Sequence, residues 1–191
     1  RWERAEGNVH VNLLCSKSRV TPLKRISTPR SELNGAVVAS RLTLSAVRSL
    51  SSANVPLGRV WFVGDSECTL SSLEKVNAPF GEYFGNRVGE VQDNQAKIEQ
   101  FCPVGDDGEW WFTPSCNNAA DILTHSDSTP ADLMAGSVLQ CGPSFLKDPR
   151  SSWPLDRNFA ACKEDYHPSH RTSKAIPMFG ANHWGQCSHK H

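Results

Sequence analysis

Apolar residues change their spacing along the chain, and each spacing predicts a different element. Val9, Val11 and Leu13 alternate with polar residues, which is typical of a half-buried strand. After a loop, Thr28 can cap a helix with Pro29 as its first residue. The apolar residues that follow lie on one helical face, so we expect this helix to pack on a sheet. That face comprises Leu33, Val37, Leu44 and Val47.

A continuous apolar run from Val60 to Val63 is bounded by turn residues and predicts a strand buried on both faces, as in α/β proteins. Asp65 would lie at the carboxyl end of this strand, where open α/β sheets collect their chemistry. The alternative is that Asp65 and Ser66 only cap the helix predicted over residues 66–75, because both residue types accept bonds from free backbone N–H groups.

The second half of the chain continues the alternation of helices and strands. EYFGNRVGEVQ predicts a helix, and GEWWFTPS predicts an aromatic strand between Gly108 and Pro114. CNNAADILTH predicts a helix with Asp121 in its first turn, and STPADLMAGSVL predicts another short helix. Hydrophobic periodicity ends near Arg157. The whole pattern favours an α/β fold.

Composition narrows the class of protein. The 191 residues are 38% hydrophobic, which is enough for one domain with an appendage. No stretch approaches the roughly 20 apolar residues of a membrane span, and the charged start shows no secretory signal. The chain does not begin with Met, so we expect a processed or truncated start. Seven scattered cysteines without a CxxC pair indicate free thiols and an intracellular location.

Charge is distributed unevenly although the formal net charge is zero. Residues 1–60 hold ten Lys and Arg against three Glu, and the rest holds ten against seventeen acids. Residues 16–30 carry five cations and no acid, which is either a phosphate-contacting stripe or simply a solvated surface. These cations are Lys17, Arg19, Lys24, Arg25 and Arg30.

Three acids occupy equivalent places at the ends of predicted elements. Glu32 lies in the first turn of a helix, Asp65 at a strand end, and Asp121 at a helix start after a strand. Carboxylates gathered from separate elements repel one another unless a cation compensates them. Their hard oxygen ligands suit Mg²⁺ or Mn²⁺, and two such ions can cleave a phosphodiester.

Several stretches in this order and spacing resemble the ribonuclease H-like domain of BEL/Pao-type retrotransposon polyproteins, across roughly residues 8–155. The resemblance rests on an ELxxA helix start, a DS pair after a buried strand, an NRV helix and an N-x-A-D step. The stretches are LLCSKSRVTPLKRISTPRSELNGAVVASRL, VWFVGDSECTL, FGNRVGEVQ, FTPSCNNAADILTHS, STPADLMAGSVLQCGPSFL and SSWPL.

The resemblance implies a role for each matching residue. Glu32, Asp65 and Asp121 correspond to catalytic, metal-binding acids that use Mg²⁺ or Mn²⁺ to hydrolyse the RNA strand of an RNA–DNA hybrid. Asp132 has a similar local sequence, but Asp121 places Gly142 and the following proline at the family's usual interval. The implied partners are the hybrid and the reverse transcriptase and integrase regions of the same polyprotein, in a cytoplasmic particle or the nucleus.

Nucleic-acid contacts are expected from the basic stripe and from the NRV helix. The hybrid would be recognised by its backbone shape and 2′-hydroxyls rather than by base sequence. Arg87 would be a structural or strand-positioning residue, with an ordinary surface arginine as the alternative. The expected contact residues are Lys17, Arg19, Lys24, Arg25 and Arg87.

The resemblance also implies a ribonuclease H-like fold, with a mixed sheet flanked by helices, together with a domain division and an incomplete acid set. We expect a ribonuclease H-like core over residues 1–126, a helical extension over 127–156 and an irregular tail over 157–191. The family carries its first catalytic Asp on a first strand, and no Asp precedes Asp65 here. We therefore expect that first strand to be missing and hybrid cleavage to be weak or absent.

Two other functions stay open. One is a degenerate or domesticated, non-catalytic nucleic-acid-binding module that keeps the fold without the chemistry. The other is a structural zinc site in the tail, although the spacing of its Cys and His residues fits no common zinc template. The residues concerned are Cys162, His167, His170, His183 and Cys187.

Overall fold

A computed structural model describes residues 1–3, 7–20, 26–75, 80–106, 110–124 and 128–157. Its longer helices are α1 (Thr28–Ser52), α2 (Glu67–Glu74) and α3 (Glu82–Glu99), with a short α4 (Val138–Cys141). The strands are β1 (Trp2–Glu3), β2 (Val9–His10), β3 (Phe62–Gly64) and β4 (Trp110–Phe112). Five 3₁₀ turns complete the order: η1 (Ser115–Asn117), η2 (Ala119–Thr124), η3 (Pro130–Leu133), η4 (Ser144–Lys147) and η5 (Arg150–Ser152).

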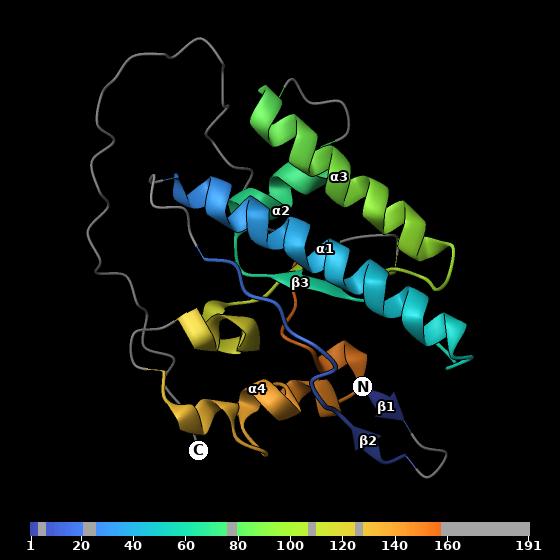
Figure 1. Cartoon of the computed structure of the whole chain (residues 1–191). Helices are drawn as coiled ribbons and strands as arrows, with labels where there is room; N and C mark the ends of the chain where they lie inside the picture. Colours follow the sequence, from blue (N-terminus) through green and yellow to red (C-terminus); the bar gives the residue numbers. More distant parts are fainter. Residues whose placement is uncertain (4–6, 21–25, 76–79, 107–109, 125–127, 158–191) are drawn as a thin grey trace.

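The three longer helices lie on one side of the central strand pair. Figure 1 shows α1, α2 and α3 on one side of β3, and α4 with the other short C-terminal elements on the opposite side. β3 and β4 are parallel, with Phe62 opposite Trp110 and Gly64 opposite Phe112. The side chains of Phe62 and Trp110 are buried and stack on each other. This arrangement is an α/β architecture, as the sequence predicts.

The predicted helical face of α1 is confirmed. Leu33, Val37, Leu44 and Val47 are all buried. They pack with Phe84, Val88, Val91 and Ile98 of α3 and with Leu70 and Leu73 of α2. The helix begins one residue earlier than predicted, after Ser27, with Pro29 in its first turn. Glu32 is consequently the fifth residue of α1 and starts its second turn.

The strands differ from the prediction in extent and pairing. The structure describes two separate two-stranded sheets, an antiparallel β1–β2 pair and the parallel β3–β4 pair, instead of one mixed sheet. β2 pairs with β1 because the two are close in sequence and a short loop can join them. β3 is buried on one face only, since Phe62 is 4% exposed and Val63 is 37% exposed.

Two predicted helices are replaced by short turns. Over residues 115–124 the chain forms η1 and η2, because Asn118 between them is extended. Over residues 130–141 it forms η3 and then α4, because Gly136 interrupts the helix with a φ of +88°. Positive φ is accessible to glycine and ends a helix.

The end of the predicted C-terminal extension, residues 127–156, contacts the strand pair and its aromatic neighbours. Asp156 pairs with Phe112 of β4, and the Arg150 guanidinium lies 4.2 Å and 4.5 Å from the ring centroids of Trp61 and Trp111. No disulfide joins the five cysteines within the described ranges, in line with the predicted thiols. None of the helices described here has the length and apolar character needed to cross a bilayer.

Candidate active site

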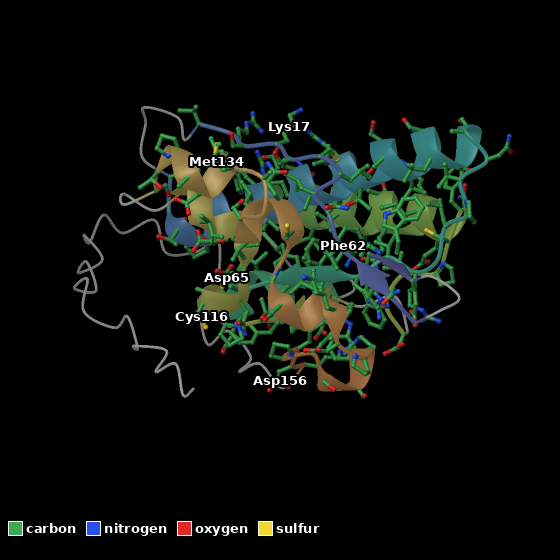
Figure 2. The ribbon with its side chains drawn as sticks, turned by 90° about the horizontal axis from the view of Figure 1, so that it is seen from below. Lys17, Phe62, Asp65, Cys116, Met134 and Asp156 are labelled. Atoms are coloured by element: carbon green, nitrogen blue, oxygen red, sulfur yellow. The ribbon has the colours of Figure 1, made fainter. Side chains whose placement is uncertain are left out.

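The three acids predicted as catalytic come from three different elements. Glu32 extends from α1, Asp65 follows β3 directly, and Asp121 lies in η2 beyond β4. The carboxyl ends of parallel strands lie at the same edge, so the segments after β3 and β4 are neighbours. Figure 2 labels Asp65 close to Cys116, which belongs to the segment after β4.

The Asp65 carboxylate is held by a residue from this neighbouring segment. The Ser115 hydroxyl donates a hydrogen bond of 3.0 Å to Oδ2 of Asp65. Asp65 does not cap α2, since the side chain that accepts from the backbone N–H of Thr69 is that of Ser66. The helix-capping alternative for Asp65 is therefore wrong, and its carboxylate remains available to the site.

Asn118 forms the turn that places Asp121. Its side-chain Oδ1 accepts a 3.2 Å hydrogen bond from the N–H of Ala120, and its carbonyl accepts a 3.1 Å bond from the N–H of Asp121. Asparagine favours such turns because its side chain can replace a backbone acceptor. Asp132, the other acid considered, instead accepts bonds from the N–H and hydroxyl of Thr129 within η3.

The negative charges of Asp65 and Asp121 affect the pKa of Glu32. Its pKa is raised above the ordinary value, first by desolvation and then by the negative charges of Asp65 and Asp121. Part of its surface is open to water, yet the surrounding protein still desolvates the carboxyl. Among the described residues, no Lys or Arg forms an ion pair with Glu32 or Asp65. The arrangement is therefore one that a cation would stabilise.

The donor set suits a hard divalent cation, because carboxylate oxygens are the ligands that Mg²⁺ and Mn²⁺ prefer. Within the described ranges, no three His, Cys, Asp or Glu side chains already surround a common metal position. The zinc alternative concerns residues 162–187, which lie outside the described residues.

The predicted nucleic-acid contacts have different surroundings. Lys17 and Arg19 are exposed on an irregular segment before α1, whereas Lys24 and Arg25 lie outside the described residues. Arg87 is half-buried between α3 and α1, where its Nε donates a 2.7 Å hydrogen bond to Oδ1 of Asn34. Arg87 thus makes a structural contact between two helices, and its predicted contact with nucleic acid stays a prediction.

Residues 1–66 match the family model of the Pao retrotransposon-like RNaseH-like domain. The resemblance to the Pao family is confirmed over these residues. The match includes Glu32 and Asp65, whereas Asp121 lies beyond it and is linked to them by the shared electrostatic field. No curated protein and no solved structure matches the chain.

Sequence reasoning predicted the three acids as catalytic, and that assignment stays a prediction. It did not predict the contacts of Ser115 and Asn118 with the segments around Asp65 and Asp121. Ser115 belongs to the aromatic strand stretch and gave no signal of its own beyond following a strand end. Asn118 is the first residue of the N-x-A-D step. The sequence therefore marks this residue, but it does not predict the turn that Asn118 forms. Both act through contacts with residues that must first be brought into place by folding.

Proposed function

We propose that this chain is a ribonuclease H-like domain of a BEL/Pao-type retrotransposon polyprotein that hydrolyses the RNA strand of an RNA–DNA hybrid. The observation that carries the proposal is the raised pKa of Glu32, to which both Asp65 and Asp121 contribute. Acids from three separate elements share one electrostatic field only if the fold brings them together. The Pao family match over residues 1–66 supports the same assignment.

Glu32, Asp65 and Asp121 would hold Mg²⁺ or Mn²⁺ in this proposal. A pair of bound ions would supply activation of a water and stabilisation of the leaving oxygen of the phosphodiester. The protein supplies acceptor oxygens and their orientation. The hydrogen bond from Ser115 restricts the rotation of the Asp65 carboxylate. The turn at Asn118 determines the position of the Asp121 backbone. Desolvation and the charges of Asp65 and Asp121 raise the pKa of Glu32, and a cation bound nearby would favour its charged form.

The hybrid would be bound through its phosphates by the basic stripe before α1. Lys17 and Arg19 are exposed and can reach solvent-borne phosphate groups. We include Lys24 and Arg25 from the sequence pattern. Such contacts position the duplex without reading its sequence. The reverse transcriptase and integrase regions of the same polyprotein are the proposed partners, within a cytoplasmic particle or the nucleus.

Cleavage of a labelled RNA strand in a hybrid tests the proposal. We expect weak Mg²⁺-dependent cleavage by the whole chain and its loss in Asp65→Asn and Asp121→Asn. Asp132→Asn is the matched control, because this nearby acid caps η3 instead of facing the site. Cleavage that survives Asp65→Asn would contradict the proposal. Hybrid binding without any cleavage would favour the non-catalytic binding module.

A further inference from the structure

Four polar residues join the start of α1 to the start of α3. Oδ1 of Asn34 accepts hydrogen bonds from the Tyr83 hydroxyl at 3.1 Å and from Nε of Arg87 at 2.7 Å. Arg87 also donates to the carbonyl of Tyr83 at 3.2 Å, and its guanidinium carbon lies 3.6 Å from the Tyr83 ring centroid. The Arg30 guanidinium carbon lies 4.6 Å from the same ring centroid.

These residues form two matching pairs on facing helices. Arg30 and Asn34 are four residues apart on α1, and Tyr83 and Arg87 are four residues apart on α3, so each pair lies on one helix face. Two donors converge on a single acceptor while two guanidiniums contact a single ring. Directional bonds of this kind resist rotation of α1 about its axis more than apolar packing does.

Glu32 lies between the two α1 members of this cluster. Successive helical residues are rotated by about 100°, so Glu32 points away from the face that carries Arg30 and Asn34. The face of α1 toward α3 is thus held by hydrogen bonds and ring contacts. Glu32 lies on the opposite face of α1, where the charges of Asp65 and Asp121 affect it. A small rotation or shift of these two turns would displace the Glu32 carboxylate directly.

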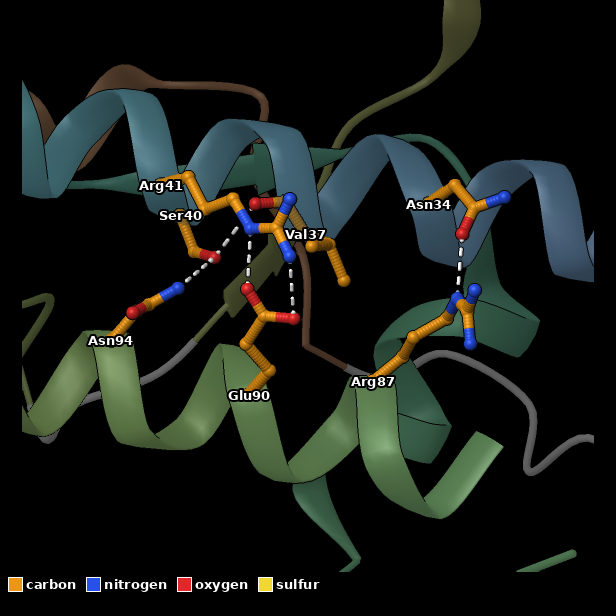
Figure 3. A network of polar contacts seen from close by, with 7 residues as sticks. All are labelled: Asn34, Val37, Ser40, Arg41, Arg87, Glu90 and Asn94. Carbon is orange, nitrogen blue, oxygen red and sulfur yellow. Dashed lines mark hydrogen bonds and ion pairs between the residues drawn. The ribbon is translucent and has the colours of Figure 1, made fainter. Parts of the chain in front are cut away.

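We infer that Arg30, Asn34, Tyr83 and Arg87 form a clamp that sets the position of the Glu32 carboxylate relative to Asp65 and Asp121. These four are positioning residues, and the inference rests on the proposed function for the meaning of that position. Figure 3 shows the Asn34–Arg87 contact separated along α1 from the Arg41–Glu90 contact, which joins the same two helices further from Glu32. The second contact is therefore a natural control.

Two substitutions of Asn34 distinguish the effect of its hydrogen-bond acceptor from the effect of its side-chain volume. Asn34→Leu keeps a similar size and removes the acceptor of both bonds, whereas Asn34→Asp keeps an acceptor for Tyr83 and Arg87. Arg41→Leu breaks the control contact between the same helices. The full chain is used throughout, and unfolding by urea verifies that each variant remains folded.

Amide hydrogen exchange gives a readout that does not depend on metal. We expect Asn34→Leu to raise exchange at residues 32–36, relative to residues 42–46 of the same variant, by about tenfold, since local opening becomes easier. Asn34→Asp and Arg41→Leu should leave this ratio near the wild-type value. An unchanged ratio in Asn34→Leu would overturn the clamp.

Binding of Mn²⁺, followed by electron paramagnetic resonance, links the clamp to the site. We expect roughly tenfold weaker binding in Asn34→Leu and wild-type binding in Arg41→Leu, as for outer residues that orient metal ligands. Equal affinity in wild type and Asn34→Leu would refute the positioning role. A wild type that does not bind Mn²⁺ would overturn the proposed function instead, and the exchange ratio would still decide whether the clamp orders these turns.

Discussion

The hydroxyl of Ser115 donates a hydrogen bond of 3.0 Å to Oδ2 of Asp65, although the two residues are 50 positions apart in the sequence. The bond crosses between the segments that follow the parallel strands β3 and β4. It fixes one carboxylate oxygen of the candidate site and leaves the other with its remaining acceptor capacity. The orientation of Asp65 is thus determined by an element other than its own.

Loss of the Ser115–Asp65 hydrogen bond should lower the affinity of the site for a divalent cation without unfolding the protein. We expect Ser115→Ala to lower Mn²⁺ affinity by roughly tenfold, because residues that orient ligands have effects of this size. Ser115 is exposed, so the free energy of unfolding should change by less than about 0.5 kcal/mol. Titration with Mn²⁺ measures the first effect. Ser144→Ala, an exposed serine in η4, is the control, and equal affinity in both variants would argue against the role of Ser115.

The raised pKa of Glu32 predicts a pH-dependent cost to stability. A carboxyl whose folded pKa exceeds its unfolded value costs nothing at low pH, where both states are protonated. The cost grows as pH rises past the unfolded pKa and is complete above the folded one. We expect Glu32→Gln to stabilise the protein at about pH 7.5 by less than about 1 kcal/mol, because water screens this partly exposed group.

Urea unfolding at about pH 3.5 and about pH 7.5 measures this difference. Glu67→Gln serves as control, since Glu67 is an exposed acid in the first turn of α2. The stabilisation by Glu32→Gln should vanish at the lower pH and should shrink when Mg²⁺ is added to the wild type. A gain that is equal at both pH values would contradict the electrostatic cause.

The buried polar contact between α1 and α3 should matter more for stability than the exposed one. Nδ2 of Asn94 donates a 3.1 Å hydrogen bond to Oγ of Ser40, and both residues are buried. We expect Asn94→Ala to lower the free energy of unfolding by about 1–3 kcal/mol through the lost bond and packing. Arg41→Gln, in the exposed pair with Glu90, should cost less than about 1 kcal/mol. Urea unfolding compares the two.

Gly142 occupies a conformation that other residues avoid. Its φ is +73° and its ψ is 166°, and a Cβ there would lie 2.9 Å from both Leu146 Cδ1 and Val11 Cγ1. We expect Gly142→Ala to lower the free energy of unfolding by about 1–3 kcal/mol or more. Gly136→Ala is the matched control, because its φ is also positive while a Cβ there would meet open space. Equal costs in thermal unfolding would show that the contacts with Leu146 and Val11 have no effect.

Exposed cations before α1 should contribute to hybrid binding through phosphate contacts. We expect the double variant Lys17→Ala/Arg19→Ala to bind an RNA–DNA hybrid more weakly and to flatten the plot of log affinity against log salt concentration by about one for each lost contact. The control pair Arg48→Ala/Lys97→Ala removes two exposed cations from the ends of α1 and α3. An identical salt slope in both pairs would exclude a specific role for this segment.

Helices and their buried faces could be predicted from the sequence because their determinants are local. The apolar spacing of α1 identified Leu33 and Val47 as core residues, and Pro29 marked the start of the helix. A helix closes its hydrogen bonds within four residues, so the pattern contains most of the information. The same locality made Ser66 recognisable as part of a helix cap.

The sequence singled out three acids as candidates, but it did not show which residues contact them. Element ends attract functional residues, which singled out Glu32, Asp65 and Asp121. Only the tertiary structure decided that Asp65 is oriented by Ser115 and that Arg87 holds α1 through Asn34. These contacts join residues about 50 positions apart. Such contacts depend on how β3 and β4 pair and on how α1 and α3 pack, and neither relationship is contained in a local pattern of hydrophobic and polar residues.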